Sequence, residues 1–334
     1  MSQMAREAAE APEAVARFLE HNAAALADLG RRLRADAPPV VITSARGSSD
    51  NAAGYFKYLT EIVLGVPCSS VGASVVSIYG ARLNVRGALA VTISQSGKSP
   101  DIVALQHEAR RAGALTVALV NTDESPASAD ASIALPLCAG LELSVAATKS
   151  VIVSLAAGAA IVASWRNDTE LLAAIGDLPE VLAKACRLEW PAFVEAAAAT
   201  SSLYVLARGP SLPIATEIAL KLKETCAVHA EAYSLAEVMH GPLELLGPGF
   251  PVLALSPEDR SRTSARDAIT RLRATGANVM AAEVGGLPVA RTAHPLLDPI
   301  SIIQTAYFAI EAVAQRRGRD PDRPRLLQKI TETV

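Results

Sequence analysis

A short stretch of the sequence occurs twice, and it decides the fold. Residues 40–49 read VVITSARGSS and residues 203–211 read LYVLARGPS, so the Ala-Arg-Gly that starts at residue 45 recurs at residue 207, 162 positions later. In both places a run of apolar and β-branched residues meets a glycine that serine follows within two positions. This pattern is typical of a buried parallel strand that ends in a turn before a helix.

The repeat continues beyond this stretch. The next strand candidates, Leu89–Ser94 and Pro251–Ser256, keep the offset of 162, and a third pair that begins at Gly113 and Gly276 differs by 163. Three strand-like runs in one register predict two copies of a single domain.

Longer helical stretches separate the strand-like runs. We expect helices at residues 51–63 and 214–226 after the first strand of each copy, and at residues 100–112 and 264–275 after the second. Strands that alternate with helices form βαβ units, in which helices cover both faces of a parallel sheet. The predicted fold class is therefore α/β, with two tandem flavodoxin-like three-layer sandwiches.

The rest of the chain is assigned around the two copies. The predicted domains are residues 36–166 and residues 201–318. Residues 1–35 are predicted to form an N-terminal segment of two helices, and residues 167–200 a helical connector. Residues 319–334 remain as a C-terminal tail.

Composition narrows the function. Hydrophobic residues make up 51% of the chain and aromatic residues 4%, which suits an aliphatic core of helices on parallel strands. The formal net charge is −3 without any basic block, so nucleic acid is not an expected partner. The uncharged stretch at residues 150–165 is too short and too interrupted by Ser and Gly to span a bilayer, so no membrane association is expected.

The cysteines and the N-terminus indicate the compartment. Four cysteines lie far apart, without a CxxC pair or a Cys/His ligand spacing, which favours buried reduced thiols and predicts no metal site. The first residues carry acids and do not resemble a signal peptide. We expect a soluble, cytoplasmic protein.

Two groups of polar side chains follow predicted strands of the first copy. Ser48 and Ser49 directly follow Gly47 in the sequence, and residues 94–99 read SQSGKS. Ligands of parallel α/β sheets bind where strands end and helices begin, and a hydroxyl-rich turn there can hold a phosphate without a metal. A serine N-cap would use the same residue types. Four hydroxyl or amide side chains within six positions favour phosphate binding, and these are Ser94, Gln95, Ser96 and Ser99.

The second copy does not repeat this group. Its counterpart reads SPED at residues 256–259, which places acids where a phosphate would bind. We therefore expect one phosphate site, in the first copy. Neither GxGxxG nor GxxxxGK[ST] occurs at these turns, so dinucleotides and nucleoside triphosphates are not expected ligands.

These motifs resemble the SIS (sugar isomerase) domain family, and most closely the isomerase half of glucosamine-6-phosphate synthase. The resemblance covers about residues 35–334 and is carried by SQSG at 94–97, VAATK at 145–149, ALKLKE at 219–224, HAEAY at 229–233, HGP at 240–242 and PRLLQK at 324–329. It implies an amino-sugar 6-phosphate substrate, Val145 and Ala147 lining the sugar, and a homodimer that shares its active sites across the interface. It implies no metal and no cofactor.

The departures from the synthase point to a related activity. The synthase has a glutaminase domain with a cysteine directly after the initiator methionine, whereas Ser2 follows Met1 here, so glutamine is not an expected nitrogen donor. Arg46, Asp50 and Ala147 also differ from the synthase motif. Such differences resemble the stand-alone amino-sugar-phosphate deaminases of the same superfamily.

Aldose–ketose interconversion needs little machinery. It moves one proton between carbons 1 and 2, and a single carboxylate can serve as base and then as acid. Glu224 is the candidate carboxylate, and Lys221 lies three residues before it, where both side chains can share one helix face. An ordinary surface ion pair would show the same spacing, so the assignment depends on the resemblance.

Two further candidates act around this step. His240 lies in a loop-like MHGP sequence and suits the proton shuttle of ring opening. The rival, His229, is expected to be a packed and hydrogen-bonded core residue. Lys329 lies in the tail, which the resemblance places over the sugar as a closing segment, with the lysine reaching the reacting carbonyl.

The predicted function is isomerising deamination of glucosamine 6-phosphate to fructose 6-phosphate and ammonia. Three alternatives within the enzyme class stay open: a galactosamine-6-phosphate deaminase, a fructosyl-amine phosphate deglycase, and a synthase-type aminotransferase/isomerase without a glutaminase domain. A sugar-phosphate sensor is the alternative without catalysis. Glu224, His240 and Lys329 speak against the sensor, because sensing alone would not require them.

Overall fold

The structure is a computed structural model, and it describes residues 1–122, 124–283 and 285–327. The chain divides into two compact units, each of which holds one copy of the repeat. The first-copy unit comprises residues 13–142 and 149–176. The second-copy unit comprises residues 1–12, residues 143–148 and the described residues from 177 onward.

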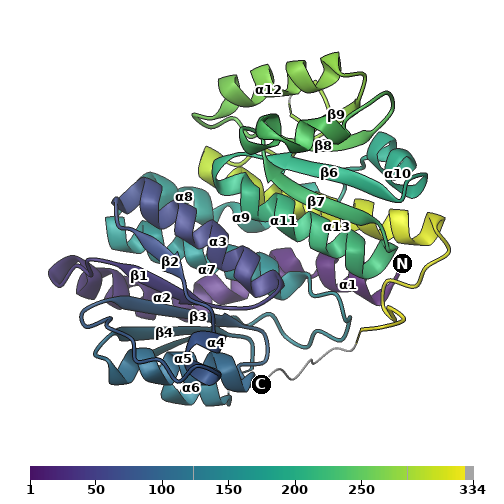
Figure 1. Ribbon diagram of the computed structural model, residues 1–334. Helices are drawn as coiled ribbons and strands as arrows, with labels where there is room; N and C mark the ends of the chain where they lie inside the picture. Colours follow the sequence, from purple (N-terminus) through teal and green to yellow (C-terminus); the bar gives the residue numbers. More distant parts are fainter. Residues whose placement is uncertain (123, 284, 328–334) are drawn as a thin grey trace. The chain divides into compact units, whose positions relative to one another are not determined.

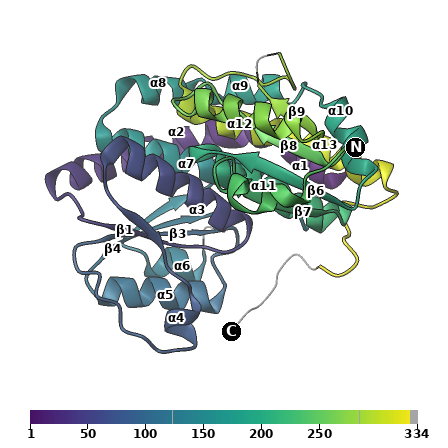
Figure 2. The same cartoon turned by 45° about the horizontal axis from the view of Figure 1, so that its top comes forward.

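The first-copy unit is built on a five-stranded parallel sheet in the order β2-β1-β3-β4-β5. Its strands are β1 (Val41–Ser44), β2 (Cys68–Ser70), β3 (Leu89–Ser94), β4 (Leu115–Val120) and β5 (Ile133–Pro136). Its helices are α2 (Ala11–Ala35), α3 (Ser48–Leu59), α4 (Ser74–Ser77), α5 (Pro100–Arg111), α6 (Pro126–Asp130), α7 (Lys149–Arg166) and α8 (Thr169–Gly176). Helices α5 and α6 lie on one side of the sheet and α3 and α7 on the other, which gives three layers (Figures 1 and 2).

The second-copy unit is built on a four-stranded parallel sheet in the order β7-β6-β8-β9. Its strands are β6 (Ser202–Ala207), β7 (His229–Ser234), β8 (Pro251–Leu255) and β9 (Asn278–Ala282). Its α-helices are α1 (Gln3–Ala9), α9 (Leu178–Ala185), α10 (Pro191–Ala198), α11 (Leu212–Lys221), α12 (Arg262–Ala274) and α13 (Asp298–Arg316). Helix α12 lies on one side of the sheet, and α11 and α13 pack together on the other (Figure 1).

Short helical turns complete the second-copy unit. Four are 3₁₀ turns: η2 (Gly209–Ser211), η4 (Glu237–His240), η5 (Pro242–Leu245) and η6 (Pro295–Leu297). Their tight geometry suits short connections.

The two sheets confirm the predicted α/β fold with two tandem copies. The order β7-β6-β8-β9 repeats the order β2-β1-β3-β4, and all pairings are parallel. In each sheet the second strand in sequence lies on one side of the first strand, and the later strands lie on its other side. The strand order therefore switches direction between β1 and β3 in the first sheet and between β6 and β8 in the second. Open α/β sheets bind ligands at such a switch point, outside the carboxyl ends of the strands.

In both copies, the helix that follows the first strand ends in a π-helical turn. The turn η1 (Thr60–Leu64) follows α3, and η3 (Leu222–Cys226) follows α11. The residue after each turn has a left-handed backbone, with φ of 70° at Gly65 and 49° at Ala227. The sequence predicted continuous helices here and did not anticipate the wider turns. Because π turns often occur at functional sites, their recurrence draws attention to the residues that they carry.

The two left-handed residues give a matched test of backbone strain. A Cβ at Gly65 would meet no atom within 4 Å, so Gly65→Ala tests the backbone alone. We expect this change to lower the free energy of unfolding by about 1 kcal/mol, because a left-handed conformation is costly for alanine. Ala227→Gly should instead raise it by up to about 1 kcal/mol. Denaturant titrations measure both values, and changes of the same sign in the two variants would contradict this account.

The short helix α1 holds two other segments of the second-copy unit. Its first two N–H groups donate to the Asp322 carboxylate at 2.6 and 2.7 Å. The buried Glu7 carboxylate accepts hydrogen bonds from the N–H groups of Leu143 and Ser144 at 2.5 and 3.1 Å. A carboxylate at a helix N-terminus is favourable because the free N–H groups carry partial positive charge. The helix thus fixes the start of the C-terminal tail and the segment 143–148.

Two helical stretches are apolar enough by length and composition to cross a membrane, namely α7 and residues 295–316. Within the protein, however, 89% and 83% of their most apolar windows are buried. A helix that is hydrophobic all round fits the core of a large protein as well as a bilayer. Both helices therefore serve as core helices of their units.

Candidate active site

The loop after β3 leads directly into the N-terminus of α5. The Gly97 N–H donates to Ser94 Oγ at 3.0 Å, and the Lys98 N–H donates to Ser96 Oγ at 3.3 Å. The hydroxyl of Ser99, the N-cap residue of α5, forms no hydrogen bond with the described part of the chain. Hydroxyls thus gather at the start of a helix, an arrangement that can hold an anion.

Gly97 fixes the shape of this loop. Its φ is +63°, and a Cβ there would lie 2.3 Å from Ser125 Oγ and 2.6 Å from Val120 Cγ1. Any other residue would be strained and would also collide with these side chains. The loop therefore depends on this glycine.

The other serine pair lies at the start of α3. Ser48 and Ser49 are the first residues of that helix, behind Gly47, and both are half-buried. Since β1 pairs with β3, the starts of α3 and α5 follow neighbouring strands. The polar groups predicted from both motifs therefore belong to one edge of one sheet.

Gln95 is held by a carboxylate that the sequence did not single out. Its Nε2 donates to Glu142 Oε2 at 3.1 Å. The buried Glu142 also accepts hydrogen bonds from Ser150, from the hydroxyl at 2.6 Å and from the N–H at 3.2 Å. Bonds to a fixed, buried carboxylate orient the amide of Gln95 beside the loop.

The second copy fills the same place with its own carboxylate. Asp259, the counterpart of Gly97 at 97 + 162, accepts hydrogen bonds from Ser261 N–H at 2.8 Å and from Ser261 Oγ at 2.6 Å. Ser261 is the N-cap residue of α12 and the counterpart of Ser99. An internal anion therefore occupies the polar groups that the first copy leaves open, which favours one phosphate loop rather than two.

The second copy instead carries a buried ammonium between two carboxylates. Lys221, with 2% of its side chain exposed, lies 2.6 Å from Glu224 Oε2 and 3.6 Å from Glu217 Oε1. The Tyr307 hydroxyl donates to Glu217 Oε1 at 3.2 Å. Glu217 is buried, whereas 23% of the Glu224 side chain is exposed. The ammonium thus orients a carboxylate that still reaches solvent.

Helix geometry explains this arrangement. Glu217 and Lys221 are four residues apart on α11, so they share one helix face. The π-helical turn η3 then carries Glu224 back to Lys221. The helical segment continues past Lys221 to Cys226, so the two carboxylates, and not a helix end, balance the charge of the ammonium.

The remaining predicted residues are placed as follows. His240 ends the turn η4, is exposed, and forms no hydrogen bond or ion pair with the described residues. Val145 and Ala147 are half-buried in the segment 143–148 of the second-copy unit. Lys329 lies outside the described residues. The prediction that His229 is a packed core residue is wrong: it is the first residue of β7 and is exposed.

The cysteines are free thiols. Burial raises the pKa of Cys68 to about 12 and that of Cys226 to about 11. A thiol with a pKa this high is almost entirely protonated near neutral pH, and therefore a poor nucleophile.

Three residues of the site were missed by sequence reasoning: Glu142, Glu217 and Tyr307. Glu217 left a weak signal, because a glutamate four residues before Lys221 on an expected helix predicts an ion pair. Glu142 and Tyr307 left none, since their partners lie 47 and 90 positions away in the sequence.

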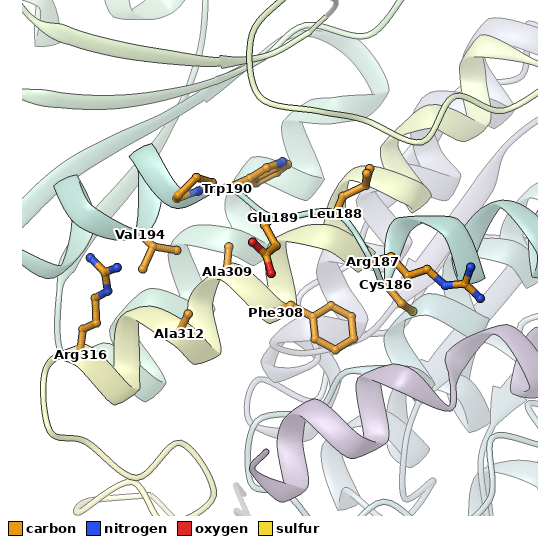
Figure 3. A pocket seen from close by; sticks show the side chains of 11 residues that line it. Cys186, Arg187, Leu188, Glu189, Trp190, Val194, Phe308, Ala309, Ala312 and Arg316 are labelled. Atoms are coloured by element: carbon orange, nitrogen blue, oxygen red, sulfur yellow. The ribbon is translucent and has the colours of Figure 1, made fainter.

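A separate cavity of about 390 Å³ lies in the second-copy unit (Figure 3). The connection from α9 to α10 forms one wall, with Glu189 and Trp190, and α13 forms the other, with Phe308 and Arg316. None of the predicted site residues lines it. The cavity is therefore not part of the candidate active site.

Comparison with known families identifies the class of protein. The sequence pattern of the SIS domain matches residues 36–164 and 198–313, one match for each copy. This chain belongs to the SIS domain family. The resemblance inferred from the motifs is thereby confirmed.

Individual relatives narrow the class. The chain is 34% identical over 303 residues to glutamine–fructose-6-phosphate aminotransferase (isomerizing) from Methanothermobacter thermautotrophicus, a match that covers 85% of this chain and 50% of the relative. A similar enzyme from Sulfurisphaera tokodaii is 32% identical over 305 residues, covering 88% and 50%. The chain thus spans about half the length of the curated relatives that it matches.

Solved structures of phosphosugar-related proteins also resemble this chain. A Silicibacter pomeroyi protein classed as a phosphosugar isomerase is 45% identical, with a TM-score of 0.93 and coverage of 96% of this chain and 100% of that one. The C-terminal domain of the Francisella tularensis glucosamine-fructose-6-phosphate aminotransferase is 25% identical, with a TM-score of 0.83 and coverage of 96% and 98%. Glucosamine-6-phosphate deaminase from Thermotoga maritima, at 21% identity and a TM-score of 0.80 over 99% and 100% of the two chains, shares the fold.

The buried ion pair predicts a large effect on stability. Glu217→Gln keeps the shape of the side chain but removes one of the two carboxylates beside Lys221. Removing one partner of a buried ion pair typically costs about 3–5 kcal/mol, so we expect a loss in the free energy of unfolding near 3 kcal/mol, because Glu224 remains. Denaturant titration measures this value.

Glu180→Gln is the matched control. Glu180 and Lys184 also form a pair four residues apart, at 2.9 Å, but both side chains are largely exposed. Water screens such a pair, so this change should leave stability nearly unaltered. Equal losses in the free energy of unfolding for the two substitutions would show that the burial of Lys221 does not determine the size of the effect.

Proposed function

We propose that this protein is an isomerising deaminase, which converts glucosamine 6-phosphate and water to fructose 6-phosphate and ammonia. Its family relatives, by their names, act on phosphosugars. The observation that carries the proposal is the Lys221–Glu224 pair, in which a buried ammonium orients a partly exposed carboxylate. One carboxylate of this kind can serve as base and then as acid in aldose–ketose isomerisation.

In the proposed reaction the first copy binds the phosphate. Ser94, Gln95, Ser96 and Ser99 supply hydroxyl and amide groups at the start of α5, and Ser48 and Ser49 supply hydroxyls at the start of α3. Neutral donors at a helix N-terminus suit a dianion, since the partial positive charge of the helix end adds to their hydrogen bonds.

The second copy supplies the acid–base chemistry. Glu224 removes the proton from carbon 2 of the open-chain sugar while the carbonyl oxygen on carbon 1 gains a proton from water, which gives an enolamine. Glu224 then returns its proton to carbon 1 while the amino nitrogen loses one to water, which gives a ketose imine. Water then adds to the imine carbon and ammonia leaves. Lys221 keeps the carboxylate oriented through both proton transfers.

His240 is proposed to open the sugar ring. An imidazole can exchange protons with the ring oxygen and the anomeric hydroxyl near neutral pH. Its exposure, and its lack of a hydrogen bond or ion pair with the described residues, support a role toward a ligand or a second subunit. In the proposed symmetric homodimer, His240 of one subunit serves the site of the other.

An ammonia assay tests the function. Purified protein is incubated with glucosamine 6-phosphate, galactosamine 6-phosphate and a fructosyl amino acid 6-phosphate, and ammonia, free amino acid and fructose 6-phosphate are measured. We expect ammonia and fructose 6-phosphate from the first sugar. Release from galactosamine 6-phosphate alone, or release of an amino acid, would replace the proposed reaction with one of the alternatives. Binding of these sugars without any product would indicate a sensor.

Glu224→Gln tests the proton carrier. The amide keeps the shape of the side chain but cannot accept the carbon 2 proton, so turnover should fall by about 10²–10⁴-fold while the substrate still binds. The variant should also lose exchange of the carbon 2 hydrogen with deuterated solvent, measured by NMR. Near-normal exchange would place the base elsewhere.

His240→Asn serves as the comparison variant. It removes the ring-opening group and leaves Glu224 in place. Exchange at carbon 2 should therefore persist when the substrate is supplied in an open-chain form. Loss of this exchange would assign His240 to the proton transfer itself.

A further inference from the structure

One charged residue beside the phosphate loop has no place in the function described so far. Arg46 follows β1 and is the central residue of the repeated Ala-Arg-Gly. Its guanidinium bonds Asp101, which lies in the first turn of α5. Its backbone carbonyl accepts hydrogen bonds from Ser49 N–H at 3.1 Å and Asp50 N–H at 3.4 Å, at the start of α3. Arg46 therefore links the N-termini of the two helices that carry the predicted phosphate ligands.

The partner of Arg46 fixes the guanidinium. The Asp101 side chain is fully buried, and its second oxygen accepts the N–H of Ile102 at 2.9 Å. A buried carboxylate is costly without a charged partner, so the pair resists separation. Arg46 itself keeps 47% of its side chain exposed. The aspartate thus holds the arginine from behind and leaves its other face open.

The open face still carries donors. A guanidinium has five N–H groups in a planar fork. The Arg46 guanidinium uses one nitrogen on Asp101 and makes no other hydrogen bond within the described residues. The fork geometry matches the oxygens of a phosphate, which Arg can bind through two parallel hydrogen bonds. The hydroxyls of the loop are neutral, and the other cation there, Lys98, is exposed and unpaired in the described chain. Arg46 would add a fixed charged donor to the neutral hydroxyls of this loop.

The second copy shows what the arginine does without this support. Arg208 is the counterpart of Arg46 at 46 + 162, but Thr263 replaces Asp101 at 101 + 162. Arg208 is exposed, and its side chain makes no hydrogen bond or ion pair with the described residues. The same copy fills its loop with the Asp259 carboxylate. The anchored arginine and the open loop therefore occur together, in the first copy only.

We propose that Arg46, oriented by Asp101, is a ligand of the phosphate group of the substrate. The proposal rests on the proposed function for the identity of the sugar, but the phosphate contact can be measured without turnover. It also gives a role to a residue in which this chain differs from the synthase motif. An arginine at this position would make the site more selective for dianionic phosphates over neutral sugars.

The test uses binding of inorganic phosphate to the full chain, measured by calorimetry in a buffer without other phosphates. Arg46→Gln should raise the Kd for phosphate, and the KM for glucosamine 6-phosphate, by about 10- to 100-fold, because a charge-assisted hydrogen bond is lost. The kcat should change much less. Arg208→Gln, the matched change in the second copy, should leave both values unaltered.

A double variant separates binding from folding, since Arg46→Gln leaves Asp101 buried without its charged partner. In Arg46→Gln/Asp101→Asn both charges are gone, so the thermal midpoint should return toward that of the parent protein while phosphate binding stays weak. Recovery of binding in the double variant would overturn the proposal, because the arginine would then serve only the fold. The proposal would also be overturned if the parent protein did not bind phosphate, or if Arg46→Gln lowered kcat and left the Kd and the KM unchanged.

The design distinguishes the two proposals. Weaker phosphate binding in Arg46→Gln, combined with no ammonia from any sugar phosphate, would refute the deaminase function and keep the phosphate contact. Normal ammonia release with unchanged KM in Arg46→Gln would refute the contact and keep the function.

Discussion

The direction of a helix in a parallel α/β sheet decides which charge each of its ends can hold. The chain leaves the carboxyl end of a strand, begins a helix there, and returns to the opposite edge as the helix ends. Free N–H groups make the first turn partly positive, and free carbonyls make the last turn partly negative. The first copy uses the first kind of end, where α5 begins behind residues 94–99. In the second copy the helical segment continues past Lys221 through η3, and the Lys221 ammonium is held by the carboxylates of Glu217 and Glu224. The helix start thus favours an anion through its backbone, whereas the place for a cation is made by side chains.

The two copies share a backbone and differ in the side chains at these ends. Glu224 lies in the second π-helical turn, and its counterpart 162 positions earlier is Ile62, which is 54% exposed. The counterpart of Lys221 is Leu59, which is fully buried. In the opposite sense, Asp259 of the second copy replaces Gly97 of the first. The first copy therefore carries the open loop at residues 94–99 and the second copy the Lys221–Glu224 pair, a difference that suits the proposed separation of phosphate binding from acid–base chemistry.

The sequence predicted those features of the fold and the site that depend on residues near each other in the chain. Each strand–turn–helix unit of the repeat and the loop at residues 94–99 depend on residues close together in the chain, so patterns of apolar and hydroxyl residues predicted them. The order of the strands within each sheet was not predicted, because it depends on how distant segments pair. The Lys221–Glu224 contact was predicted from helix spacing, and it forms although Glu224 lies in a π turn. Tyr307 could not be predicted, because its bond to Glu217 depends on how α13 packs on α11. His229 was misjudged because its apolar neighbours do not decide which face of a strand a residue occupies.

The segment at residues 142–149 shows how support for the site is distributed along the chain. Glu142 belongs to the first-copy unit and holds the amide of Gln95, in the loop at residues 94–99. The next residue, Leu143, belongs to the second-copy unit and is held by Glu7 of α1. The residues that the family resemblance assigns to the sugar, Val145 and Ala147, follow directly in the segment that Glu7 holds. Glu7 therefore supports these positions without being expected to touch the substrate itself, as Glu142 does for Gln95.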